Sequence, residues 1–164
     1  HRNNNTDEPR RLNAIVRAVI KLSEDKDIII PLHPRTKKLL NVNLDSATYD
    51  TFINNSRIHI TEPVSFLEMI SLEKNASLVL TDSGGVQKEA YFFKKPCIIM
   101  RSETEWKEIV EVGAAIIADA DEERIIEAYH HFKDNDAIEF PEIFGDGRAA
   151  EFICKELINN KTRS

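Results

Sequence analysis

The chain has 164 residues, of which 41% are hydrophobic and 30% are charged, and this composition is typical of a globular domain with one hydrophobic core. Its formal net charge of −6 gives no electrostatic reason to expect nucleic acid or an anionic membrane as a partner. No apolar run approaches the roughly 20 residues of a membrane span, and no signal peptide is visible, although the chain begins without Met. The two cysteines, in apolar patterns and far apart, are typical of a cytoplasmic protein, which we therefore expect.

Helix and strand patterns alternate along the chain, which predicts an α/β fold with a parallel sheet wrapped by helices. Thr6 or Asp7 is expected to cap the first helix, with Pro9 in its first turn. One face of that helix carries Leu12, Ile15, Val16, Val19 and Ile20. A buried strand at 27–32, short helices at 36–42 and 49–54, and a strand at 57–60 follow.

Ser65 and Glu68 have the spacing of a capping box, which starts a helix carrying Phe66, Met69 and Ile70. Further strands are predicted at 78–80, 97–100 and 114–118, and further helices at 105–112 and around 125–132. The last helix is expected to turn Ala150, Ile153, Cys154 and Leu157 inward. Cys97 and Cys154 both lie in apolar patterns, so we expect reduced core thiols with no disulfide or metal role.

One stretch, 81–90, reads Thr-Asp-Ser-Gly-Gly-Val-Gln-Lys-Glu-Ala and leads from a buried strand into a helix. Such a turn leaves backbone N–H groups of Ser83, Gly84 and Gly85 at the helix start for an anion, and the lack of side chains at the two glycines permits its close approach. Glu89 lies one turn further on the same face, where its carboxylate can accept hydrogen bonds from sugar hydroxyls. This pattern favours a nucleotide site, and the alternative is an ordinary turn without a ligand.

The stretch 83–90, followed by Lys95-Pro96-Cys97 and Met100-Arg101, resembles the signature of the non-hydrolysing UDP-N-acetylglucosamine 2-epimerases. The resemblance runs from 1–2 to the Gly-Asp-Gly at 145–147, where the glycines permit positive φ. It implies that 1–164 is a single nucleotide-sugar-binding domain, the C-terminal Rossmann-like half of a glycosyltransferase-B type enzyme, with helices on both faces. The family's His-Arg pair follows a central strand, so we expect a fragment that lacks this strand and the N-terminal domain.

The resemblance also implies roles for individual residues. His1 and Arg2 match the pair that approaches the nucleotide phosphates, the alternative being an N-terminal stub. The wall of the uracil site matches Val64, Phe66 and Met69. His33 matches a His near the substrate and regulatory pocket, although a strand-end His satisfied by the backbone is an equal alternative.

Residues 101–108 depart from the commonest family pattern, because Trp106-Lys107 replaces an Arg-Pro pair. The Glu-Thr-Glu-Trp form resembles the branch that acts on UDP-2,3-diacetamido-2,3-dideoxy-glucuronate. Arg101 and Trp106 are therefore candidates for a sugar or regulatory pocket. Trp106 either stacks on a sugar or base or packs against the sheet.

By this resemblance the chain is the UDP-binding half of an isomerase of cell-envelope polysaccharide synthesis, which inverts C2 of a UDP-acetamido sugar by elimination and re-addition of UDP. It assigns no catalytic residue to this chain, which alone is expected to be inactive, and implies no cofactor. We expect no metal site, since the adjacent His130 and His131 do not share a helix face. The whole enzyme is expected to form a homodimer. The alternatives are the donor-nucleotide domain of a glycosyltransferase and a non-catalytic nucleotide-binding fragment.

Overall fold

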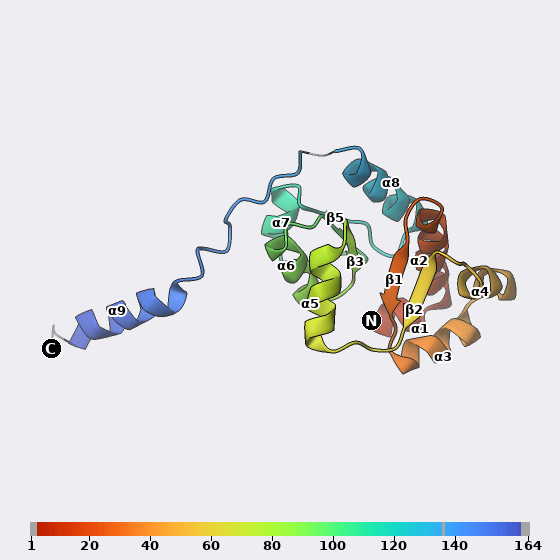
Figure 1. Cartoon of the computed structure of the whole chain (residues 1–164), viewed down its shortest axis with the longest axis horizontal. Helices are drawn as coiled ribbons and strands as arrows, with labels where there is room; N and C mark the ends of the chain where they lie inside the picture. The colour runs from red at the N-terminus through yellow and green to blue at the C-terminus, as the bar shows by residue number, and fades with distance from the viewer. Residues whose placement is uncertain (1–2, 136, 162–164) are drawn as a thin grey trace.

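Two separate parallel sheets carry the strands of the computed structural model, which describes residues 3–135 and 137–161 (Figure 1). The first sheet pairs β1 with β2, and the second has the order β3-β4-β5. The strands are β1 (Ile28–Pro31), β2 (Ile58–Thr61), β3 (Val79–Thr81), β4 (Cys97–Ile99) and β5 (Ala115–Ile117). Each predicted strand is confirmed, with its ends displaced by one residue at most.

Helices alternate with these strands as the sequence predicts. They are α1 (Asn3–Asp7), α2 (Pro9–Ser23), α3 (Pro34–Asn43), α4 (Ser46–Ile53), α5 (Phe66–Asn75), α6 (Gly84–Phe92), α7 (Lys107–Glu111), α8 (Glu122–Lys133) and α9 (Ala149–Lys161). The capping box of α5 is present, because the Ser65 and Glu68 side chains each bond the other's backbone N–H.

Helices cover both faces of the second sheet. On one face α2 and α8 pack together against β4, through Ala18, Leu22, Ile98, Ile125 and Tyr129. On the other face the helices α6 and α7 bury Ala90, Tyr91, Ile99 and Ile109. A third cluster joins α2, α3 and α4 to the first sheet, through Val16, Leu40, Phe52 and Ile58.

The break between the two sheets lies between β1 and β3, which no ladder joins in the described part of the chain. In a doubly wound sheet of order 3-2-1-4-5-6, the strand between these two is the first one. Absence of this first central strand predicts a sheet in two unjoined halves, β2–β1 and β3–β4–β5, and the structure has these halves.

The first strand is less buried than the sequence predicts. Leu32 is buried, but the side chain of Ile29 is 52% exposed. Its face of the sheet is open, because α2, α3 and α4 all pack on the opposite face (Figure 1). Three consecutive isoleucines therefore do not imply burial on both faces here.

The predicted cap of the first long helix is wrong. Glu8 is the N-cap of α2, and its side chain makes no capping bond, although Pro9 is in the first turn as expected. Thr6 and Asp7 belong instead to the short helix α1. The Asp7 carboxylate accepts two bonds from Arg35, at 2.6 and 2.8 Å, and one from the Thr6 hydroxyl, so it is held by α3 and α1 and not by the start of α2.

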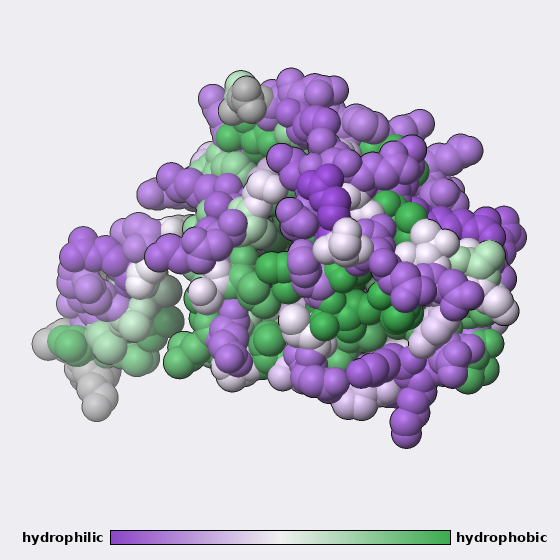
Figure 2. All heavy atoms as spheres, turned by 45° about the vertical axis from the view of Figure 1, so that its right-hand side comes forward, coloured by the Kyte–Doolittle hydropathy of each residue, from purple (hydrophilic) through white to green (hydrophobic). Residues whose placement is uncertain are grey.

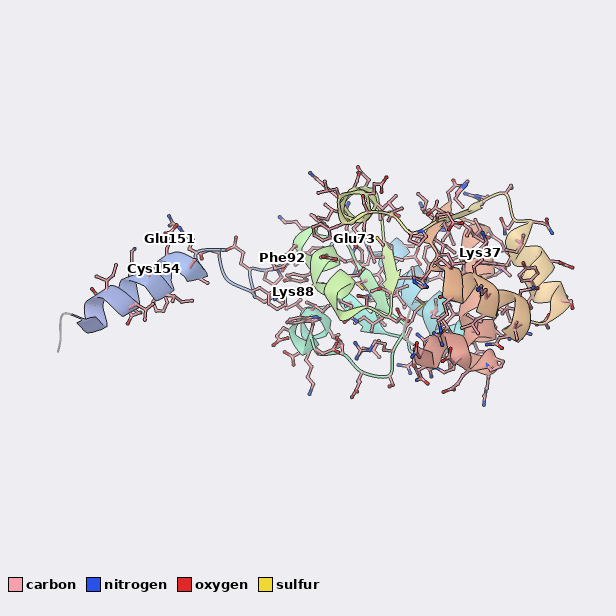
Figure 3. The ribbon with its side chains drawn as sticks, turned by 90° about the horizontal axis from the view of Figure 1, so that it is seen from below. Lys37, Glu73, Lys88, Phe92, Glu151 and Cys154 are labelled. Atoms are coloured by element: carbon pink, nitrogen blue, oxygen red, sulfur yellow. The ribbon has the colours of Figure 1, made fainter. Side chains whose placement is uncertain are left out.

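The inward face expected for the last helix is also wrong. In the structure α9 projects away from the rest of the chain (Figures 1 and 3), and its apolar residues Phe152, Ile153, Leu157 and Ile158 are 56–68% exposed. Periodicity shows that a helix has an apolar face, but it does not show which element covers that face. Among the described residues, no helix is long and apolar enough to span a membrane.

The two cysteines consequently differ. Cys97 is buried in β4, as expected, and burial raises the pKa of its thiol to about 12, with a smaller contribution from the negative charge of Glu73. Cys154 is exposed on α9, so its assignment to the core is wrong. The structure pairs neither in a disulfide.

We expect a maleimide reagent at neutral pH to label Cys154 rapidly and Cys97 at least about 10²-fold more slowly, because the reagent needs an accessible thiolate. Mass spectrometry of the native and the urea-unfolded chain measures both rates. The Cys154→Ser variant is the control and should stay unlabelled until it unfolds. Rapid double labelling of the native chain would contradict the burial of β4.

Candidate functional site

The turn from β3 into α6 has the geometry of an anion site. Ser83 is the N-cap residue of α6, with extended backbone, and its side chain makes no capping bond. The N–H groups of Gly84 and Gly85 open the helix and have no acceptor within it. A helix start with uncapped donors favours a negatively charged ligand, both through these N–H groups and through the helix dipole.

One of the three predicted backbone donors is already engaged. The Ser83 N–H donates to Oγ1 of Thr81 over 3.0 Å, so it is held inside the turn. The predicted role of Ser83 as a backbone donor to the phosphates therefore needs correction. Gly84 and Gly85 keep their N–H groups for a ligand, and Ser83 contributes the position of the turn.

The two glycines face different surroundings. A Cβ atom at Gly84 would lie 3.1 Å from Oε2 of Glu105 and 3.8 Å from Nε1 of Trp106. A Cβ atom at Gly85 would meet nothing closer than Oγ of Ser83, at 3.8 Å. Gly84 is therefore needed for packing against the loop 101–106, whereas the side-chain direction of Gly85 is open to a ligand.

That loop is fixed by an ion pair and by contacts to α6. Arg101, which is only 9% exposed, binds Glu105 through two bonds of 2.6 and 3.0 Å, and this carboxylate raises the pKa of the guanidinium. The indole N–H of Trp106 donates to the carbonyl oxygen of Gly84 over 2.7 Å. The hydroxyl of Thr104 donates to the buried side chain of Gln87 over 2.5 Å.

The ring of Trp106 is occupied by protein groups. Nζ of Lys88 lies 4.3 Å from the Trp106 ring centroid and 4.5 Å from that of Phe144. The two rings meet edge to face at 5.7 Å, and Lys88 also lies over Phe92, its neighbour on α6 (Figure 3). In the structure Trp106 thus packs against Lys88 and Phe144, and its stacking on a sugar or base stays a prediction.

Glu89 lies one turn into α6, half-buried, as the sequence predicts. A second carboxylate, which the sequence analysis missed, lies on the neighbouring helix α5. Glu73 is 4% exposed, and neither of its oxygens has a hydrogen-bond partner in the described part of the chain. Burial raises the pKa of Glu73 to about 7, with a further contribution from the negative charge of Glu89. Its position three residues after Ile70, on the same side of the helix, was the available signal.

The other predicted site residues lie further from this turn in the chain. His33 is exposed at the start of α3, where its Nδ1 accepts a bond from the N–H of Arg35, and its place near a substrate or regulatory pocket stays a prediction. Val64 and Met69 are half-buried, but Phe66 is 68% exposed at the first residue of α5. Their contact with uracil stays a prediction, and His1 and Arg2 lie outside the described residues.

Val64 lines a hollow of about 390 Å³ on the open face of the first sheet, where Figure 2 shows hydrophobic side chains gathered. The hollow lies between β1, β2 and α5 and is lined by Ile29, His59, Thr61, Val64, Glu68, Ser71 and Leu72. A second hollow, of about 360 Å³, lies between β5 and α8. The lining of neither includes the glycine turn or Glu89.

The predicted turn at 145–147 is confirmed, because Gly145 and Gly147 have φ of 79° and 78°. The segment before it is held against α6, since the hydroxyl of Tyr91 donates to the carbonyl oxygen of Pro141. In the described ranges no group of three or more His, Cys, Asp or Glu side chains has the arrangement of a metal site.

We expect the free energy of unfolding to depend on pH through Glu73. A carboxyl whose pKa is raised by folding binds its proton more tightly in the folded state, so its stabilising effect is present below the unfolded pKa and is lost as pH rises. Between about pH 4.5 and pH 7 the contribution should fall by roughly 1–3 kcal/mol. Urea unfolding across this range measures it.

The matched variant is Glu73→Gln, which keeps the shape of the side chain without the titration. Its pH dependence should be flatter by the same amount, and Glu123→Gln serves as the control at an exposed position of α8. Equal slopes in Glu73→Gln and the wild type would show that Glu73 is not buried as an acid.

Comparison with known proteins shows the family to which the chain is similar. A family model described as UDP-N-acetylglucosamine 2-epimerase matches residues 1–158. The UDP-N-acetylglucosamine 2-epimerase of Methanocaldococcus jannaschii is 43% identical over 163 residues, which are 98% of this chain and 43% of the relative. The UDP-2,3-diacetamido-2,3-dideoxy-D-glucuronate 2-epimerase of Pseudomonas aeruginosa is 38% identical over 161 residues, covering 96% of this chain and 42% of the relative.

The solved structures agree. The M. jannaschii enzyme superposes with a TM-score of 0.87 at 43% identity, over 97% of this chain and 44% of that one. The same enzyme in complex with UDP-GlcNAc and UDP gives a TM-score of 0.83 over 97% of this chain and 43% of that one. The chain thus spans less than half the length of these relatives, and it belongs to the UDP-N-acetylglucosamine 2-epimerase family.

Proposed function

We propose that this chain is the nucleotide-binding part of a UDP-N-acetylglucosamine 2-epimerase, in which α6 and its glycine turn hold UDP. The observation that carries the proposal is the uncapped start of α6 at Gly84 and Gly85, followed by Glu89 one turn later. Two backbone donors suit the diphosphate, and a carboxylate at that distance suits the ribose hydroxyls. A relative at 43% identity has been solved with UDP-GlcNAc and UDP, which supports the choice of nucleotide.

The chemistry follows from the position of these donors. Inversion at C2 by elimination breaks the bond between C1 and the UDP oxygen, so negative charge grows on the diphosphate. N–H groups fixed at the start of a helix stabilise that charge without reorganising, and they accelerate the step if the bonds strengthen in the transition state. The part of the enzyme described here therefore holds the leaving group.

The sugar is the second element of the proposal. The Arg101–Glu105–Trp106 arrangement and the relative from P. aeruginosa favour a UDP-2,3-diacetamido-2,3-dideoxy-D-glucuronate as an alternative to UDP-N-acetylglucosamine. Assays of the whole enzyme with each substrate in turn show which sugar is converted. In D2O the converted sugar should carry deuterium at C2, because elimination and re-addition exchange the C2 proton with solvent. Turnover that requires an acceptor sugar would instead indicate a glycosyltransferase.

For the whole enzyme we propose a homodimer that acts in the cytoplasm. Size-exclusion chromatography with light scattering tests the assembly, and fractionation of the source cells tests the compartment.

Calorimetric titration of the chain with UDP tests the nucleotide site. We expect saturable binding that weakens by about 10-fold or more in Glu89→Ala, because two hydrogen bonds to ribose are lost. Gly85→Val should abolish binding, since its side chain fills the open direction that the ligand needs.

The control is Glu123→Ala, which removes an exposed carboxylate from α8 and should bind UDP like the wild type. Far-UV circular dichroism of every sample establishes that it is folded. A folded wild-type chain that does not bind UDP would overturn the assignment.

A further inference from the structure

Asn5 lies in α1 at the carboxyl edge of the second sheet, and it is 4% exposed. Its side-chain nitrogen donates to the carbonyl oxygen of Met100 over 2.8 Å and to Oδ2 of Asp82 over 3.2 Å. Met100 follows β4, and Asp82 lies between β3 and the N-cap residue Ser83. One amide group therefore joins the ends of two adjacent strands, beside the proposed diphosphate site.

Arg11 completes this arrangement from α2. Its guanidinium donates to Oδ1 of Asn5 through two bonds, of 3.1 and 2.9 Å. It also binds Asp119, two residues beyond β5, with a shortest distance of 2.5 Å, which lowers the pKa of that carboxyl. A continuous set of polar contacts thus crosses the carboxyl ends of β3, β4 and β5.

Only an amide fits at position 5. The side chain of Asn5 donates both of its N–H groups to Met100 and Asp82 while its oxygen accepts from Arg11. An aspartate there would keep the bond from Arg11 but would place a second carboxylate 3.2 Å from Asp82. An apolar residue would leave buried donors and acceptors unpaired, at a cost of roughly 1–3 kcal/mol each.

The contact has a direct consequence for the turn. Asp82 is the residue before Ser83, whose N–H is held from the other side by Thr81. The backbone that leads to Gly84 is therefore fixed at two points, one of them through Asn5.

We propose that Asn5 is a positioning residue for the nucleotide site, which fixes Asp82, and with it the start of α6, against α1. The proposal rests on the proposed function, because the fixed turn is the one that binds the diphosphate. Arg11 acts one step further away, by holding the amide of Asn5 in the orientation that donates to Asp82.

Two measurements on the 164-residue chain test this role. Amide hydrogen exchange reports the order of residues 83–87 without any ligand, and titration with UDP reports the site. In Asn5→Ala we expect the hydrogen-bonded amides within 83–87, those of Ser83 and Gln87, to exchange about 10-fold faster, and UDP to bind about 10-fold more weakly. Exchange in β2, which Asn5 does not contact, should stay unchanged.

Conservative variants separate positioning from a general loss of stability. Asn5→Asp should weaken UDP binding more than Asn5→Ala, through repulsion of Asp82. Combining Asn5→Asp with Asp82→Asn should restore part of the affinity, since the new amide at 82 can donate to the carboxylate at 5. Asn75→Ala is the control, because Asn75 is exposed and its side chain bonds only within α5.

The outcomes decide separately on the two proposals. Absence of UDP binding in the folded wild type overturns the proposed function, and the exchange data then decide on Asn5 alone. Unchanged exchange at 83–87 and unchanged UDP affinity in Asn5→Ala overturn the role of Asn5, as does a uniform rise of exchange over the whole chain. Should Asn5→Ala not fold, Asp82→Ala replaces it, because it removes the acceptor of the Asn5 amide, with the same expected changes at 83–87.

Discussion

The parallel register of β3, β4 and β5 is the constraint on which the candidate site depends. Val79, Cys97 and Ala115 are aligned across the three strands, so all three strands end at the same edge. The residues just beyond that edge, Asp82 and Met100, then lie close enough for one side chain to join them. Side chains separated by up to 108 positions in the sequence meet there, as Arg11 and Asp119 do. Because the three short apolar strands are in register, the polar residues that follow them gather at one edge, which can hold a ligand.

The start of α6 is held on its other side by the loop 101–106. An N–H donor from Trp106 and a hydroxyl donor from Thr104 bind α6, and the Glu105 carboxylate lies against Gly84. A carboxylate beside an anion site would oppose a diphosphate, but Glu105 is paired with the guanidinium of Arg101. This pairing at 2.6 Å offsets most of the repulsion between Glu105 and a bound diphosphate, so the loop can pack closely against α6 without preventing anion binding.

The sequence predicts the strands, most of the helices and the glycine turn, because these depend on local patterns. Periodicity places β1 to β5 within one residue, and two adjacent glycines after an apolar run indicate the helix start. It does not predict the engaged N–H of Ser83, the packing of Trp106 on Lys88 or the burial of Glu73. Each of these depends on which side chain lies opposite in space, and that is decided by tertiary contacts, which a pattern of spacing does not contain.

The exposed α9 and the break between the sheets also depend on tertiary contacts that a pattern of spacing does not contain. Their polar and apolar surfaces are visible in the sequence, but no described residue covers the apolar face of α9 or joins β1 to β3.

The break between the sheets also has a consequence for the site. Strand order runs one way from β1 to β2 and the other way from β3 to β5, so the order reverses between β1 and β3. In open α/β sheets, ligands bind at the carboxyl ends of strands where this reversal occurs. His33 follows β1 and Ser83 follows β3, so the reversal point lies between the two segments that the sequence associates with the ligand. The glycine turn therefore lies at an edge where backbone donors, a helix dipole and a strand-order reversal coincide.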